Sequence, residues 1–117
     1  MTSLVACIST GKGTWAHVAQ LISQEKWDKI YLVTEEFGMK FQAPENAEFV
    51  IIKNSKSVQE ISKDIQNQLK GKILDLEVAV NLISGEGKEH MALISALLSL
   101  PVGIRFTALT KEGIIFM

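Results

Sequence analysis

The feature that most constrains the fold of this 117-residue chain is a repeated alternation between short apolar runs and stretches with helical periodicity. Apolar runs fall at residues 3–8, 29–34, 49–52 and 78–83, and helical patterns follow at 14–22, 58–70 and 88–100. Runs of this length, bounded by turn residues, are typical of strands buried on both faces. The alternation therefore predicts parallel strands joined by right-handed helical crossovers.

Helix-capping and turn residues support this order of strands and helices and add a final hairpin to it. Ser57 and Glu60 have the spacing of a capping box, and Gly71 lies where the following helix should end. Residues 35–48 predict a short helix and then a loop. Residues 102–109 and 113–116 are separated by too few residues for a crossover, so they predict an antiparallel hairpin. We expect an α/β, Rossmann-like three-layer sandwich, mostly parallel with a C-terminal antiparallel β-hairpin, forming a single domain over residues 1–117.

Charge and composition exclude several classes of protein. A net charge of -1 argues against a protein that coats nucleic acid, so no DNA binding is expected. The single cysteine, Cys7, forms no internal disulfide and is predicted to be a buried core thiol of a reducing compartment. The N-terminus lacks a basic leader and no apolar stretch is long enough to span a bilayer, so we expect a cytoplasmic chain with no membrane partner. No metal-ligand spacing is present, and neither a metal nor a cofactor is expected.

Two glycine-containing loops follow predicted strands and precede predicted helices. In an open parallel sheet, ligands bind beyond the carboxyl ends of the strands. Hydroxyls, glycines, a lysine and a helix N-terminus are the ingredients of an anion site, and both loops contain them. The candidate binding residues are Ser9, Thr10, Gly11, Lys12 and Gly13 in the first loop, and Ser84, Gly85, Glu86, Gly87, Lys88 and His90 in and after the second. An alternative is that these glycines only make tight turns.

Two common nucleotide-binding motifs do not fit these loops. A Walker A motif would need glycine at Ala6 and serine or threonine at Gly13, so NTP hydrolysis is disfavoured. Gly85 and Gly87 match half of a dinucleotide fingerprint, but His90 occupies its third glycine position. An NAD enzyme is also disfavoured, because no acidic residue stands in the usual ribose-reading place after the second strand.

The segment 80–93 resembles the signature that follows the fourth strand of CRISPR-associated Rossmann-fold (CARF) domains. That signature reads as an apolar strand, Thr/Ser-Gly-Gly-x-Lys/Arg and an apolar helix. Ser84, Gly85 and Lys88 hold its hydroxyl, first glycine and basic positions, whereas Glu86 replaces the second glycine. Residues 9–11 and 27–34 are similar to the beginning of the family's fold.

The resemblance implies a homodimer that binds a cyclic oligoadenylate second messenger across its two-fold axis. A chain without an effector domain would then be a metal-independent ring nuclease, or a sensor that acts through a separate CRISPR effector protein. In a ring nuclease the ligand's 2′-hydroxyl attacks the adjacent phosphate, with Lys88 stabilising the developing charge and Ser9, Thr10 or Ser84 positioning the phosphate. The alternative is a non-catalytic Rossmann-like module that binds a nucleotide or a protein.

Overall fold

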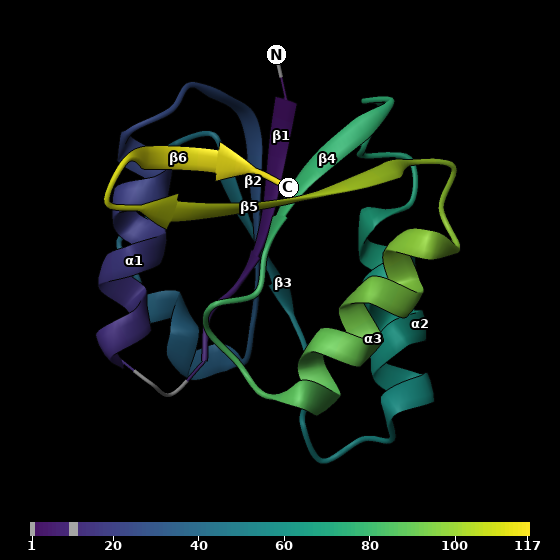
Figure 1. Ribbon diagram of the computed structural model, residues 1–117. Coiled ribbons are helices and arrows are strands. Elements are labelled where there is room, and N and C mark those ends of the chain that lie inside the picture. The colour runs from purple at the N-terminus through teal and green to yellow at the C-terminus, as the bar shows by residue number, and fades with distance from the viewer. Residues whose placement is uncertain (1, 10–11) are drawn as a thin grey trace.

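The chain forms a six-stranded sheet with the order β3-β2-β1-β4-β5-β6 (Figure 1). The computed structural model describes residues 2–9 and 12–117. The strands are β1 (Thr2–Cys7), β2 (Trp27–Thr34), β3 (Ala47–Ile51), β4 (Glu77–Asn81), β5 (Gly103–Thr110) and β6 (Gly113–Phe116). The helices are α1 (Lys12–Ser23), the 3-10 helix η1 (Glu36–Lys40), α2 (Val58–Leu69) and α3 (Gly87–Leu98). Neighbouring strands are parallel except β5 and β6, which form the predicted antiparallel hairpin.

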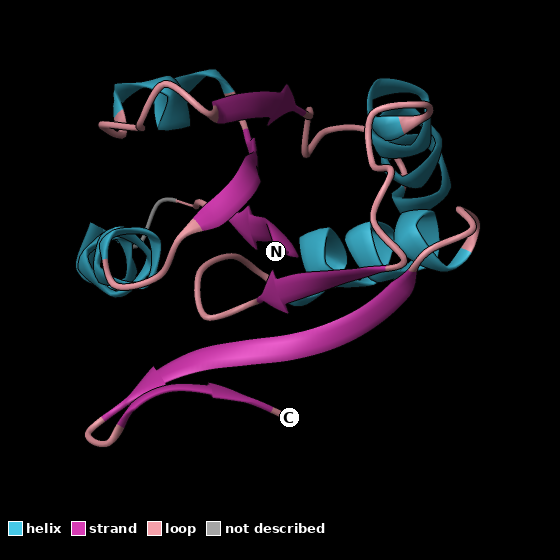
Figure 2. Ribbon diagram, turned by 90° about the horizontal axis from the view of Figure 1, so that it is seen from above, coloured by secondary structure: helices cyan, strands magenta, loops and turns pink. Residues whose placement is uncertain are grey.

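The helices cover both faces of the sheet, so the expected three-layer α/β sandwich is confirmed. Figure 2 shows α1 on one side and α2 with α3 on the other. Side chains of β1 alternate between two cores: Val5 and Cys7 pack with α2 and α3, whereas Leu4 and Ala6 pack with α1. This alternation is the two-residue period of a strand, and both of its faces are apolar because both are covered.

The predicted helix boundaries of α2 are confirmed. The Ser57 side chain accepts the backbone N–H of Glu60, and the Glu60 side chain accepts the backbone N–H of Ser57. Gly71 has a φ of +80°, the left-handed conformation that favours glycine just after a helix. The first helix, α1, begins at Lys12, two residues before the helical pattern at 14–22.

The sheet edge formed by β3 is capped by a side chain of α2. The Gln68 amide accepts the backbone N–H of Ile51 at 3.2 Å and donates to its carbonyl at 2.9 Å. Gln68 thus makes the pair of hydrogen bonds that a neighbouring strand would make. Such caps protect an edge from pairing with another chain.

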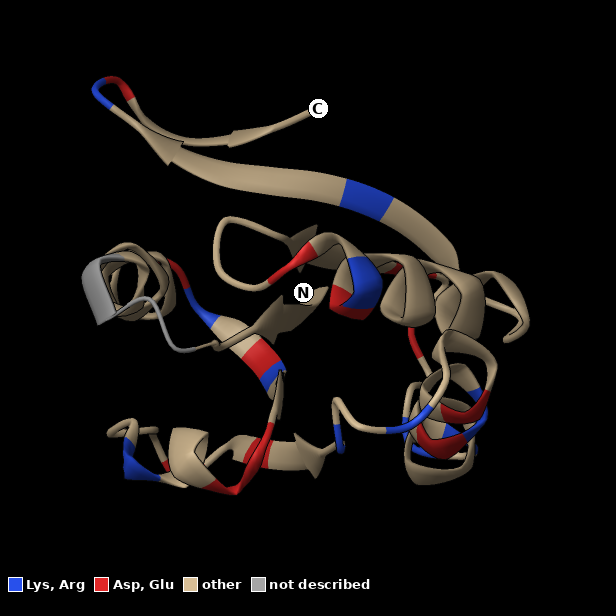
Figure 3. Cartoon of the chain, turned by 90° about the horizontal axis from the view of Figure 1, so that it is seen from below, with Lys and Arg blue, Asp and Glu red and all other residues tan. Residues whose placement is uncertain are grey.

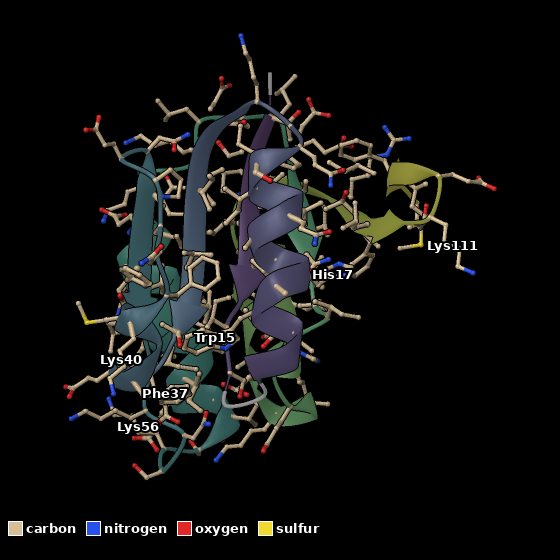
Figure 4. The ribbon with its side chains drawn as sticks, turned by 90° about the vertical axis from the view of Figure 1, so that its left-hand side faces the viewer. Trp15, His17, Phe37, Lys40, Lys56 and Lys111 are labelled. Atoms are coloured by element: carbon tan, nitrogen blue, oxygen red, sulfur yellow. The ribbon has the colours of Figure 1, made fainter. Side chains whose placement is uncertain are left out.

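The β5–β6 hairpin lies against α1. His17, on α1, points toward the hairpin, whose turn carries Lys111 (Figure 4). The His17 Nε2 atom accepts the backbone N–H of Leu109 on β5 at 3.4 Å. Within the part of the chain that the structure describes, no helix is long and apolar enough to cross a bilayer.

Candidate functional site

The loops after β1 and β4 meet where the strand order reverses. The chain places β2 and β3 on one side of β1 and β4 to β6 on the other. The helices that follow β1 and β4 therefore lie on opposite faces of the sheet, and open α/β sheets bind their ligands beyond the carboxyl ends of such strands. The two loops are joined there, because the backbone N–H of Ser9 donates to Ser84 Oγ at 2.9 Å. The structure brings the two predicted serines into direct contact.

A buried carboxylate lies beneath this junction. Glu89, in the first turn of α3, is 2% exposed. Its Oε1 atom accepts the backbone N–H of Glu86 at 2.8 Å and is 3.4 Å from the Ser9 hydroxyl, which donates to it. No ion pair to Glu89 forms among the described side chains. The site consequently combines two serine hydroxyls with a negative charge held at the N-terminus of α3.

The second loop turns sharply at Gly85. Its φ is +110°, a conformation that side chains rarely adopt. A Cβ atom there would lie 2.9 Å from His90 Nε2. The Nε2 atom is 2.9 Å from the carbonyl oxygen of Ser84, so it carries the proton and donates. His90, a candidate binding residue from the sequence, therefore lies beside the loop and stabilises its turn through this hydrogen bond.

Lys88 follows the second loop but contacts a third one. Its ammonium donates to the carbonyl oxygen of Asn54, after β3, at 2.7 Å. The backbone N–H of Asn54 in turn donates to Glu35, which directly follows β2, at 3.3 Å. Lys88 is exposed, so its long side chain can exchange this single neutral acceptor for a phosphate. The contact ties three carboxyl-end loops together.

The other predicted site residues begin the helices after the two loops or lie outside the described residues. Thr10 and Gly11 lie outside them. Lys12 and Gly13 are the first residues of α1, and Gly87 is the first residue of α3. Among the described residues, no group of three or more His, Cys, Asp or Glu side chains is arranged to hold a metal ion.

Cys7 is a core thiol, as predicted. Burial, and secondly the Glu89 carboxylate, raise the pKa of Cys7 far above its ordinary value of 9.0. The thiol stays protonated at neutral pH, and a protonated thiol is a poor nucleophile and metal ligand. Cys7 therefore contributes packing and no chemistry.

The outer face of α3 is apolar and uncovered. Met91 and Leu98 are 66% and 70% exposed, and they line a shallow groove of about 670 Å³ with Ile94 between them. Charges on α3 occur only at its N-terminal end, at Lys88 and Glu89 (Figure 3). Apolar residues occupy both sides of this helix, and the chain itself covers only the side that carries Ala92, Leu93, Ala96 and Leu97. The uncovered face runs up to the Ser84–Lys88 loop.

Two residues of the site escaped the sequence analysis. Glu89 follows the N-cap residue Glu86 by three positions, which is the capping-box spacing, but the usual Ser or Thr is absent at the cap. Asn54 acts through its backbone, and a backbone carbonyl leaves no signal in the sequence.

Comparison of the sequence with protein-family models and with curated proteins finds no match. The resemblance to CARF domains therefore depends on this chain's own residues, chiefly Ser84, Gly85 and Lys88.

Proposed function

We propose that this protein binds a cyclic oligoadenylate, or a related phosphate-bearing nucleotide, at the carboxyl ends of β1 and β4. The observation that carries the proposal is the direct contact between the two candidate loops, in which Ser9 donates to Ser84 at the point where the strand order reverses. Open α/β sheets bind their ligands at such points. Among phosphate-bearing nucleotides, the CARF-like pattern of Ser84, Gly85 and Lys88 favours a cyclic oligoadenylate as the ligand.

The proposal includes a homodimer formed through the outer face of α3. This face is free of charge after Glu89, so two copies related by a two-fold axis would bury it without like-charge repulsion. The face is continuous with the Ser84–Lys88 loop, and pairing about a two-fold axis that runs along α3 would place the two copies of that loop at the same end of the interface. A symmetric ring is a suitable ligand for a site made of two identical halves.

The test is incubation with cyclic tetra-adenylate and cyclic hexa-adenylate in EDTA, followed by thermal melting and product chromatography on the same samples. Ligand at 100 times its Kd would stabilise the fold by about 2.7 kcal/mol. Trp15 gives a second readout, because its indole N–H donates to the backbone carbonyl of Ser9. We expect a raised Tm and altered Trp15 fluorescence.

The products separate the two activities. Linear products with a 2′,3′-cyclic phosphate would establish a metal-independent ring nuclease, and Lys88→Ala would then abolish cleavage but leave binding. A raised Tm with intact ligand would establish a sensor that acts through a separate CRISPR effector protein. An unchanged Tm and unchanged fluorescence with every ring size would refute the proposal.

The dimer is tested by charge substitution. Met91→Glu and Leu98→Glu place carboxylates on the outer face of α3 and should give monomers in sedimentation. Leu74→Glu is the matched control, since Leu74 is an exposed leucine in the loop before β4. If both α3 variants sediment like the unmodified protein, this helix is not the dimer interface.

A second candidate function is a non-catalytic module that binds a partner protein through α3. The exposed Met91 and Leu98 favour it, because large apolar patches mark interaction sites. Monomers in sedimentation without any response to cyclic oligoadenylates would support this function.

A further inference from the structure

Ser9 is held in one orientation at the junction of the loops that follow β1 and β4. Its backbone N–H donates to Ser84 Oγ, and its backbone carbonyl accepts the Trp15 indole N–H. Its hydroxyl donates to Glu89 Oε1, and the residue is only 6% exposed. Ser9 thus has described partners for its amide, its carbonyl and its hydroxyl proton.

The carboxylate decides the direction of the Ser9 hydroxyl. A carboxylate accepts hydrogen bonds and donates none, so the Ser9 proton is directed toward Glu89. Glu89 is itself fixed, because the same oxygen accepts the backbone N–H of Glu86 at 2.8 Å. No described residue donates a hydrogen bond to the Ser9 hydroxyl oxygen, so its lone pairs are placed to accept one from a ligand.

This polarity does not suit a phosphate group at Ser9. Phosphate oxygens accept hydrogen bonds and carry negative charge, so they need a donor and are repelled by the buried Glu89 carboxylate. A hydroxyl group has the opposite character, since it carries a proton to donate and no charge. The pair formed by Ser9 and Glu89 therefore matches a sugar hydroxyl better than a phosphate.

We infer that Ser9, oriented by Glu89, accepts a hydrogen bond from a ribose 2′-hydroxyl of the ligand and selects ribonucleotides over deoxyribonucleotides. The inference rests on the proposed function and gives Ser9 a role different from the phosphate positioning expected from the sequence. Glu89 is a positioning residue, because it acts through Ser9.

The test compares the Kd of cyclic tetra-adenylate with that of its all-2′-deoxy analogue. We expect the unmodified protein to prefer the ribose ring by about tenfold or more, because the deoxy ring leaves a buried acceptor unpaired. Ser9→Ala should remove this preference. Glu89→Gln should reduce it, since the glutamine keeps the side-chain shape and an acceptor for Glu86 but no longer fixes the Ser9 proton. Ser62→Ala is the control, because Ser62 is also 6% exposed but lies between α2 and α3.

The outcomes distinguish the inference from the proposed function. Failure of the unmodified protein to bind either ring would overturn both. Equal affinity for the two rings would leave the proposed function in place and overturn the role of Ser9. A preference that survives in folded Ser9→Ala and Glu89→Gln would also overturn it, and would assign the discrimination to another residue.

Discussion

Replacement of Gly85 by alanine tests the geometry of the second loop. At a φ of +110° a side chain costs about 1–3 kcal/mol of backbone strain. The new Cβ would lie 2.9 Å from His90 Nε2 and displace it, which breaks the hydrogen bond to Ser84 and costs about 1 kcal/mol more. We therefore expect Gly85→Ala to lower the free energy of unfolding by about 2–4 kcal/mol.

The chain provides a matched control for the strain. Gly113 has a φ of +105°, and among the described residues no atom beyond its chain neighbours lies within 4 Å of the Cβ position there. Gly113→Ala should therefore show the strain without the displacement, and the two variants should differ by about 1 kcal/mol. With an m-value of about 2 kcal/mol/M, that difference moves the urea midpoint by about 0.5 M.

A double substitution isolates the contact with His90. In a His90→Ala background, the same Gly85→Ala change should cost only the strain, so the two substitutions should not be additive. The assay is urea unfolding followed by circular dichroism. If Gly85→Ala costs no more than Gly113→Ala, the contact between Gly85 and His90 does not hold the turn, and the reasoning is wrong.

Three further predictions follow from features outside this turn. Gln68→Ala removes both hydrogen bonds to Ile51, so it should lower the free energy of unfolding in urea by about 1–2 kcal/mol and increase association at high concentration. An unchanged urea midpoint would argue against the cap. Cys7 should react with a thiol reagent only on unfolding, because burial raises its pKa, and rapid labelling of the folded protein would contradict this. Hydrogen bonds from the backbone and side chain of Ser57 lower the pKa of Glu60 below 4.5, so its stabilising effect is present above that pH and is lost as the pH falls through the lowered value. The stability difference between the unmodified protein and Glu60→Gln should shrink over that range in acid unfolding.

The fold was largely predictable because its signals are local. Strand periodicity and the cap at Ser57 depend on near neighbours in the sequence, and Gly71 marks a helix end by its own conformational freedom. The sequence also placed Ser9 and Ser84 at the carboxyl ends of strands. Their contact could be anticipated only if β1 and β4 are neighbours, which the local patterns do not specify.

Side-chain directions within the site were less predictable. Lys88 is long and flexible, and it lies on the backbone of Asn54, which any residue type would provide. Glu89 turns back toward Glu86 and Ser9, so its charge is buried although acidic side chains are rarely buried. The positions of these charges depend on three loops meeting in space.

The central position of β1 has a consequence for how the chain acquires its structure. Val5 pairs with Tyr31 on β2 and with Val80 on β4, so one neighbour lies close in sequence and the other lies far away. During synthesis, β1, β2 and β3 emerge first, and the second side of β1 stays unpaired until β4 has been made. We expect the joining of β4 to β1 to limit the folding rate, since distant strands pair slowly. Until then the free side of β1 is an apolar strand edge, open to incorrect pairing with other chains.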